Sequence, residues 1–149
     1  MLAKTTKRLA AHHLLSEALA ALLDRGDALT AIVLGDAAED VYAGLLKRES
    51  RAGDSAMQEM VPHVRAFAAI DDPSAQPPSD KRVITAMRRT FDWLRHNDWE
   101  IDPQEREVDF DLEAAAIIER AIVNEDRLTG VAHPRWQELL ARHGRDAER

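Results

Sequence analysis

Arg89 and His96 are the residues whose types and spacing most clearly favour chemistry in this sequence. Their separation of seven residues is about two turns of an α-helix, so both side chains are expected on one face, roughly 10 Å apart along the axis. Asp92 and Trp93 lie between them on that face. A guanidinium holds a phosphate with two parallel hydrogen bonds, and a histidine moves a proton near neutral pH. The pair therefore has the groups needed to cleave a phosphodiester through a ribose 2′-hydroxyl without a metal.

Two ordinary structural roles fit the same residues. Arg89 can pair with Asp92 or with an acid on another helix, and His96 can interact with the dipole at the C-terminal end of its helix. Spacing alone leaves these roles open beside the chemical one. More basic side chains in the same segment would add phosphate attraction: Lys81, Arg82, Arg88 and Arg95.

The arginine, six intervening residues and the histidine resemble the R-x(4–6)-H motif of the HEPN family (higher eukaryotes and prokaryotes nucleotide-binding). Residues 9–46, 92–97 and 110–130 are also similar to successive parts of bacterial HEPN-like helical proteins. The resemblance implies a homodimer in which Arg89 holds the scissile phosphate of RNA and His96 orients or activates the 2′-hydroxyl. The family often has Asn, Asp or His directly after the arginine, where this sequence has Thr90. The resemblance therefore leaves two functions open, a protein that cleaves RNA and a protein that only binds it.

Charge is distributed unevenly along the chain. The formal charge of −7 argues against a general binder of polyanions. Residues 80–96 are nevertheless basic, and the eleven acids of residues 97–128 follow them. The alternative function is thus a non-enzymatic helical interaction module. Its acidic segment, residues 98–111, would bind a basic partner such as a co-expressed protein, or close over the basic helix.

No metal and no other cofactor is expected from local spacing. The 149 residues include no cysteine, which excludes disulfides and thiolate metal sites. None of the six histidines lies in a Glu-x-x-His, His-x-x-x-His or His-Glu-x-x-His pattern. His13 and Glu17, one helical turn apart, offer at most half a site. Because no charge-free run of 18 apolar residues occurs and nothing indicates secretion, we expect no membrane span and a cytoplasmic location.

Apolar residues recur at helical spacing through most of the chain, and no segment alternates with a period of two. We expect one all-α domain over residues 1–149, an up-and-down bundle of about five helices plus a short C-terminal helix. Loops are expected at 71–79 and 97–109, and a mobile tail at 144–149. The expected helices span about 5–25, 27–48, 55–69 with Pro62 kinking or splitting it, 79–96, 111–128, and a short one from Pro134. Asp27 or Thr30 is expected to cap the second helix, Ser79 or Asp80 the fourth, and Gly130 should end the fifth. The short joint at Gly26 and Asp27 predicts that the first two helices form an antiparallel hairpin.

The polar residues of two helices carry further expectations. In the helix 111–128, Ile117 and Ile122 face the core while Arg120 and Asn124 face the opposite side. In the helix 27–48, Gly35 costs roughly 1 kcal/mol relative to alanine, so we expect close approach of a neighbouring helix there. The acids beside it either extend a polar cluster toward the basic helix or form a solvated face: Asp36, Glu39 and Asp40.

Overall fold

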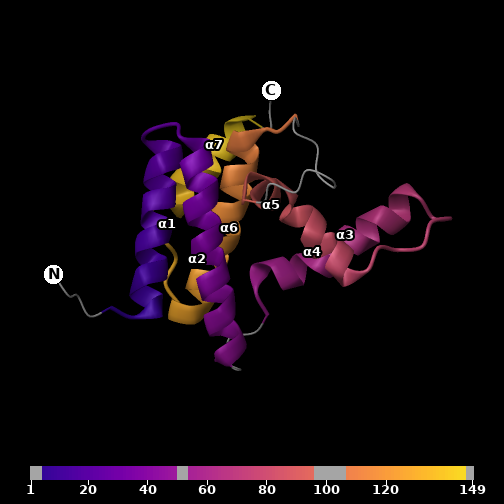
Figure 1. Ribbon diagram of the computed structural model, residues 1–149, viewed down its shortest axis with the longest axis horizontal. Coiled ribbons are helices and arrows are strands. Elements are labelled where there is room, and N and C mark those ends of the chain that lie inside the picture. The colour runs from indigo at the N-terminus through magenta and orange to yellow at the C-terminus, as the bar shows by residue number, and fades with distance from the viewer. Residues whose placement is uncertain (1–4, 50–53, 96–106, 147–149) are drawn as a thin grey trace. The chain divides into compact units, whose positions relative to one another are not determined.

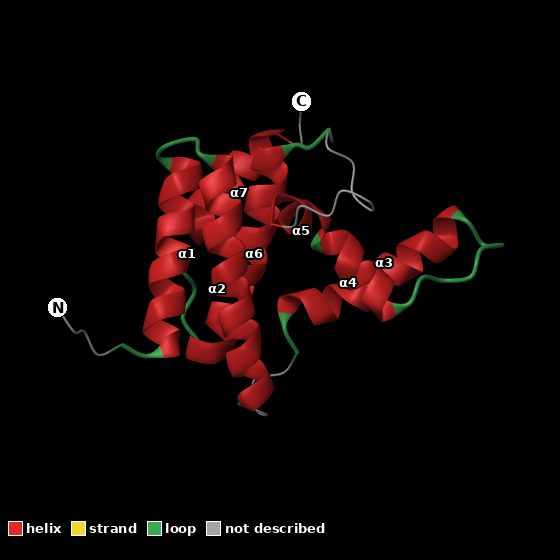
Figure 2. Cartoon of the chain, viewed as in Figure 1, coloured by secondary structure: helices red, strands yellow, loops and turns green. Residues whose placement is uncertain are grey.

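The computed structural model describes residues 5–49, 54–95 and 107–146. These ranges consist of helices joined by loops and contain no strand, which confirms the all-α class (Figure 2). None of the helices within them is long and apolar enough to cross a membrane. The helices are α1 (Lys7–Leu23), α2 (Ala28–Arg48), α3 (Ala56–Asp71), α4 (Asp80–Met87), α5 (Arg89–Arg95), α6 (Phe110–Thr129) and α7 (Trp136–Asp146).

The contacts of the chain group into two compact units. Unit 1 contains α1, α2, α6 and α7, and unit 2 contains α3, α4 and α5. In the sequence, unit 2 is inserted between α2 and α6.

Side-chain caps set the boundaries of the first two helices. The Thr6 hydroxyl accepts a hydrogen bond from the Leu9 N–H at 3.1 Å, and the Asp27 carboxylate accepts one from the Thr30 N–H at 3.1 Å. Gly26 has φ +65°, a left-handed conformation that suits glycine and reverses the chain between the helices. Of the two expected caps, Asp27 and Thr30, the structure has Asp27, and the hairpin at Gly26 is confirmed.

Helix α2 packs against both α1 and α6 in unit 1, and α1 runs antiparallel to both (Figure 1). The expected close approach at Gly35 is confirmed, since a Cβ there would lie 3.1 Å from Ile117 Cγ2 and 3.2 Å from Ile118 Cγ1. Small size at this position lets two helix backbones come together. The largest fully buried side chains of the unit 1 core are Leu15, Leu19, Leu22, Ile32, Tyr42, Leu46, Ile118, Ile122, Asn124 and Leu139.

Helix α6 is buried on more than its apolar side. The prediction that Arg120 and Asn124 face away from the core is wrong, because both are buried. Arg120 Nε donates to Glu39 Oε1 of α2 at 2.9 Å. The buried positive charge of α6 is thus paired with a buried negative charge of α2. Asp36 and Glu39 are therefore buried and are not members of a solvated face, whereas Asp40 is exposed.

Helix α3 of unit 2 continues through Pro62 without being split and packs against α4. The single expected helix over 79–96 is wrong. It begins at Ser79, one of the two expected caps, but divides at Arg88, whose φ of −94° and ψ of 0° lie in the bridge region. Arg88 still donates its N–H to the Ile84 carbonyl at 3.0 Å, so the division is a change of backbone direction and not a break in this hydrogen bond. The guanidinium of Arg88 lies over the Phe91 ring, 5.7 Å from its centroid. Apolar spacing does not reveal this division because it continues unchanged across the turn.

Several expectations fall on residues outside the described ranges. These are His96, nearly all of the loop at 97–109 together with most of the acidic segment 98–111, and the last three residues of the tail. Helix α7 extends to Asp146, past the expected start of the tail at Gly144.

Candidate functional site

The predicted chemical face begins with Arg89, the first residue of α5. Arg89 is exposed, whereas its neighbours Thr90 and Phe91 are buried, with 4% and 8% of their surface exposed. Asp92 and Trp93 follow Arg89 at three and four residues and are half-buried. These positions place Arg89, Asp92 and Trp93 on one face of α5 and the two buried residues on the other. The arginine is therefore presented at the surface by a helix that is anchored through its opposite side.

The structure describes three of the other four predicted phosphate-binding side chains, those of Lys81, Arg82 and Arg88. Lys81 and Arg82 are exposed in the first turn of α4, and Arg88 is half-buried. Asp80, which begins α4, is paired with Arg65 of α3 at 2.9 Å. The Arg95 side chain and all of His96 lie outside the described residues, so the approach of His96 to Arg89 stays a prediction.

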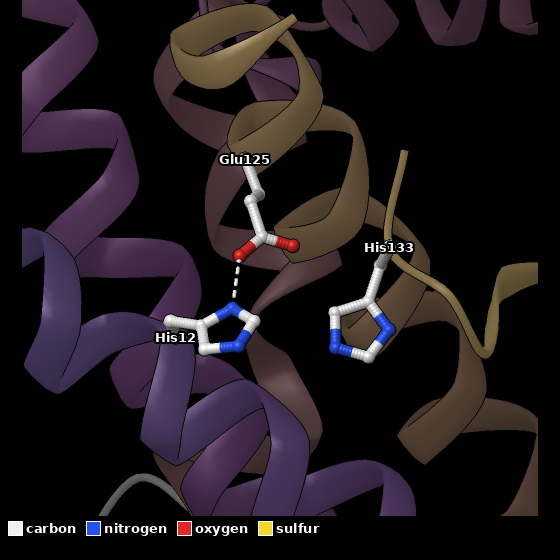
Figure 3. Close-up of side chains that lie close together, drawn as sticks. All are labelled: His12, Glu125 and His133. Carbon is white, nitrogen blue, oxygen red and sulfur yellow. Dashed lines mark hydrogen bonds and ion pairs between the residues drawn. The ribbon is translucent and has the colours of Figure 1, made fainter. Parts of the chain in front are cut away.

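A second group of side chains, in unit 1, was not predicted. His12 from α1, Glu125 from α6 and His133 from the loop between α6 and α7 lie together (Figure 3). His12 Nδ1 is 2.6 Å from Glu125 Oε1, and the two imidazole rings are 5.6 Å apart between centroids. One ligand atom from each residue lies within 4.8 Å of the other two. We call these three residues the His–Glu–His cluster.

Glu125 is a carboxylate held inside the bundle. The residue is 5% exposed, and the Tyr42 hydroxyl of α2 donates to its Oε1 at 2.7 Å. Burial, followed by the hydrogen bond to the Glu125 carboxylate, raises the pKa of Tyr42, so the phenol stays protonated and remains a donor. The second oxygen, Oε2, is buried and has no hydrogen-bond partner in the described part of the chain.

His133 is buried, and its surroundings favour the uncharged imidazole. It is 6% exposed, and its Nδ1 accepts the Arg135 backbone N–H at 3.2 Å. Burial lowers the pKa of His133, and this effect exceeds the opposing influence of the Glu125 carboxylate. Its Nε2 has no hydrogen-bond partner within the described ranges and lies on the side of the ring that faces His12 (Figure 3). The His12 side chain, by contrast, is half exposed, so one side of the cluster is open to solvent and the other side is buried.

The loop that carries His133 is fixed at both ends. Gly130 ends α6 with φ +69°, the left-handed cap expected at this position. Arg135 donates two hydrogen bonds to Asp24 at the end of α1, at 2.7 and 2.8 Å, and two more to Glu138 of α7. The hydrogen bonds from Arg135 lower the pKa of both Asp24 and Glu138. The α6–α7 loop is thereby tied to α1, the helix that supplies His12.

Local spacing could not reveal the His–Glu–His cluster, because two of its members are 113 residues apart. Only helix packing brings α1 and α6 together. The expected half-site at His13 and Glu17 is not part of the cluster, which contains His12 and not its exposed neighbour His13. The one signal in the sequence is that Glu125 and His133 flank the predicted helix stop at Gly130, which places the histidine where the chain turns back.

Comparison with known proteins gives no match for this chain among protein-family models, curated proteins or solved structures. The HEPN resemblance stays a prediction from the residues quoted above.

Proposed function

We propose that the protein binds RNA through the surface of α4 and α5 and cleaves it without a metal, acting as a homodimer. The observation that supports this proposal is the exposure of Arg89 on α5, on the side away from buried Thr90 and Phe91. An arginine anchored in this way can hold a phosphate with two parallel hydrogen bonds while its helix stays packed. His96 directly follows the last residue of α5 in the sequence and supplies the proton-transfer group.

The reaction is an internal transesterification. Arg89 binds the non-bridging phosphate oxygens and stabilises the charge that develops on them. His96 takes the proton of the ribose 2′-hydroxyl as its oxygen forms a bond to phosphorus, and the bond from phosphorus to the 5′ oxygen breaks. The leaving oxygen takes up a proton from water, and His96 gives the proton that it took back to the solvent. The products are a 2′,3′-cyclic phosphate and a 5′-hydroxyl, and no metal or redox partner takes part.

Local positive charge is proposed to bring the RNA to this surface. Lys81 and Arg82 are exposed in the first turn of α4, in an otherwise acidic chain. If the protein contacts three phosphates of a single strand, its affinity for RNA should fall about 20-fold when the salt concentration rises from about 50 mM to about 200 mM. Replacing Lys81 by alanine should weaken binding to all RNA sequences alike and lower the slope of log affinity against log salt by about 0.7.

RNA cleavage by the full chain in the presence of a chelator tests the proposal. Arg89→Ala and His96→Ala should each lower the rate by about 100-fold or more, because each removes a group that acts in the reaction. Arg65→Ala is the matched control, since Arg65 is an exposed arginine whose partner is Asp80. It should leave the rate within about twofold, and thermal unfolding should show that all variants are folded.

Two results would contradict the proposal. Cleavage that survives both Arg89→Ala and His96→Ala would assign the activity to other residues. A wild-type protein that neither binds nor cleaves RNA would favour the non-enzymatic interaction module instead. The homodimer is tested by light scattering, which should give about twice the 16.7 kDa mass of the chain.

A further inference from the structure

We propose that His12, Glu125 and His133 form a binding site for one divalent transition-metal ion, for which Zn²⁺ is the best fit. The three residues come from α1, α6 and the α6–α7 loop of unit 1 (Figure 3). The site belongs to unit 1 and the Arg89 face to unit 2, and neither proposal depends on the other.

The donor types are those of a known class of metal site. Two imidazole nitrogens and one carboxylate oxygen are the protein ligands of several open zinc centres, and the same combination holds non-haem iron(II). Such a set leaves at least one coordination position for water. His12 is half exposed, so the open coordination position would lie on the solvent-exposed side of the cluster, where an ion can enter.

Two unsatisfied buried atoms point into this space. Glu125 Oε2 and His133 Nε2 are both buried and lack a hydrogen-bond partner in the described ranges. Buried polar atoms are nearly always paired, so two such atoms in one cluster make this a place where a water or an ion can bind. A cation that accepts a lone pair from the carboxylate and one from the imidazole would satisfy both atoms, and metal titration distinguishes it from a bridging water.

The distances need only side-chain adjustment. Zinc bonds of 2.0–2.1 Å in a tetrahedral arrangement place neighbouring ligand atoms roughly 3.4 Å apart. One ligand atom from each of the three residues lies within 4.8 Å of the other two. His12 Nδ1 now lies 2.6 Å from Glu125 Oε1, so the His12 imidazole must turn away from this hydrogen bond to reach an ion beside Oε2. His12 can supply the movement because its side chain is half exposed on the surface of α1. Glu125 and His133, which are packed in place, need to move least.

The surroundings favour binding by the two buried residues. Tyr42 donates to Glu125 Oε1, so it can orient the carboxylate while Oε2 binds the ion, as outer-shell partners of metal sites do. Burial keeps His133 neutral, the form that binds metal. Its proton must move from Nε2 to Nδ1 on binding, which gives up the contact with the Arg135 N–H. At 3.2 Å that contact is a long and weak hydrogen bond, so a metal–nitrogen bond outweighs it.

Titration of the full chain with Zn²⁺, after removal of any histidine tag and of bound metal, tests this site. The wild type should bind one equivalent with micromolar or tighter affinity. His12→Ala should weaken binding by more than about 100-fold, since loss of an outer-shell partner alone costs roughly 10–100-fold. Tyr42→Phe, which keeps all three ligands, should weaken it by about 10-fold.

His13→Ala is the matched control, because it removes the neighbouring, exposed histidine of the same helix. It should leave Zn²⁺ affinity within about twofold. Imidazole NMR signals of the wild type give a measurement free of any folding effect: those of His12 and His133 should shift on Zn²⁺ addition, and that of His63 should not. A wild type that binds no Zn²⁺, an equal loss in His12→Ala and His13→Ala, or unshifted His12 and His133 signals would overturn the proposal.

Discussion

Gly35→Ala tests the closest contact between α2 and α6, on which the geometry of unit 1 depends. The added Cβ would lie 3.1 Å from Ile117 Cγ2 and 3.2 Å from Ile118 Cγ1. Both isoleucines are buried, at 2% and 0% exposed, and β-branched side chains have few alternative rotamers in a helix. The neighbours therefore cannot easily make room.

The expected magnitude comes from two opposing terms. Alanine is better than glycine inside a helix by about 1 kcal/mol. Overfilling a packed interface costs about 1–3 kcal/mol. The net change is a loss of about 1 kcal/mol in the free energy of unfolding, with a range of about 0–2 kcal/mol. At this chain length such a loss lowers the melting temperature by roughly 2–4 °C.

Gly44→Ala supplies the comparison within the same helix. A Cβ at Gly44 meets nothing within 4 Å, so only the favourable propensity term applies there. Gly44→Ala should therefore raise the free energy of unfolding by about 0.4–1 kcal/mol. Urea unfolding followed by circular dichroism should separate the two variants by about 2 kcal/mol. Equal stabilisation by both substitutions would refute the close approach of α2 and α6.

Two further predictions concern buried charge. Glu39→Ala leaves the buried Arg120 without its ion-pair partner and should lower the free energy of unfolding by about 3–5 kcal/mol, whereas Arg8→Ala, at the exposed pair with Glu49, should cost at most about 1 kcal/mol. Equal losses in urea unfolding would contradict the buried pair. The lowered pKa of His133 means that the unfolded chain binds a proton more readily than the folded one. Stability should thus fall as pH drops below about 6.5, by up to about 1.4 kcal/mol per pH unit, and His133→Gln in a chelator should flatten this dependence.

The helix boundaries were predictable because local signals set them. Asp27 caps α2, Ser79 caps α4 and Gly130 ends α6, each through a contact with residues a few positions away. Gly35 was informative for the same kind of reason: an unfavourable residue inside a helix indicates a compensating contact. The division at Arg88 was missed because a backbone turn of one residue leaves the apolar spacing intact.

What escaped prediction depends on long-range packing. Periodicity assigns a helix one polar face and one apolar face, but α6 contacts α1, α2 and α7, so Arg120 and Asn124 are buried as well. The partner that makes the burial of Arg120 tolerable, Glu39, is 81 residues away in the sequence. The His–Glu–His cluster was missed for the same reason.

The chemistry of the RNA ends tests the central functional claim most directly. Wild-type protein freed of metal should convert RNA, in a chelator, to fragments that carry 2′,3′-cyclic phosphates and 5′-hydroxyls, because the proposed reaction uses the 2′-hydroxyl as nucleophile. Arg89→Ala, which removes the exposed phosphate-binding residue of α5, should produce neither. Intact RNA with the wild-type protein, or fragments with 5′-phosphate ends, would contradict the proposal.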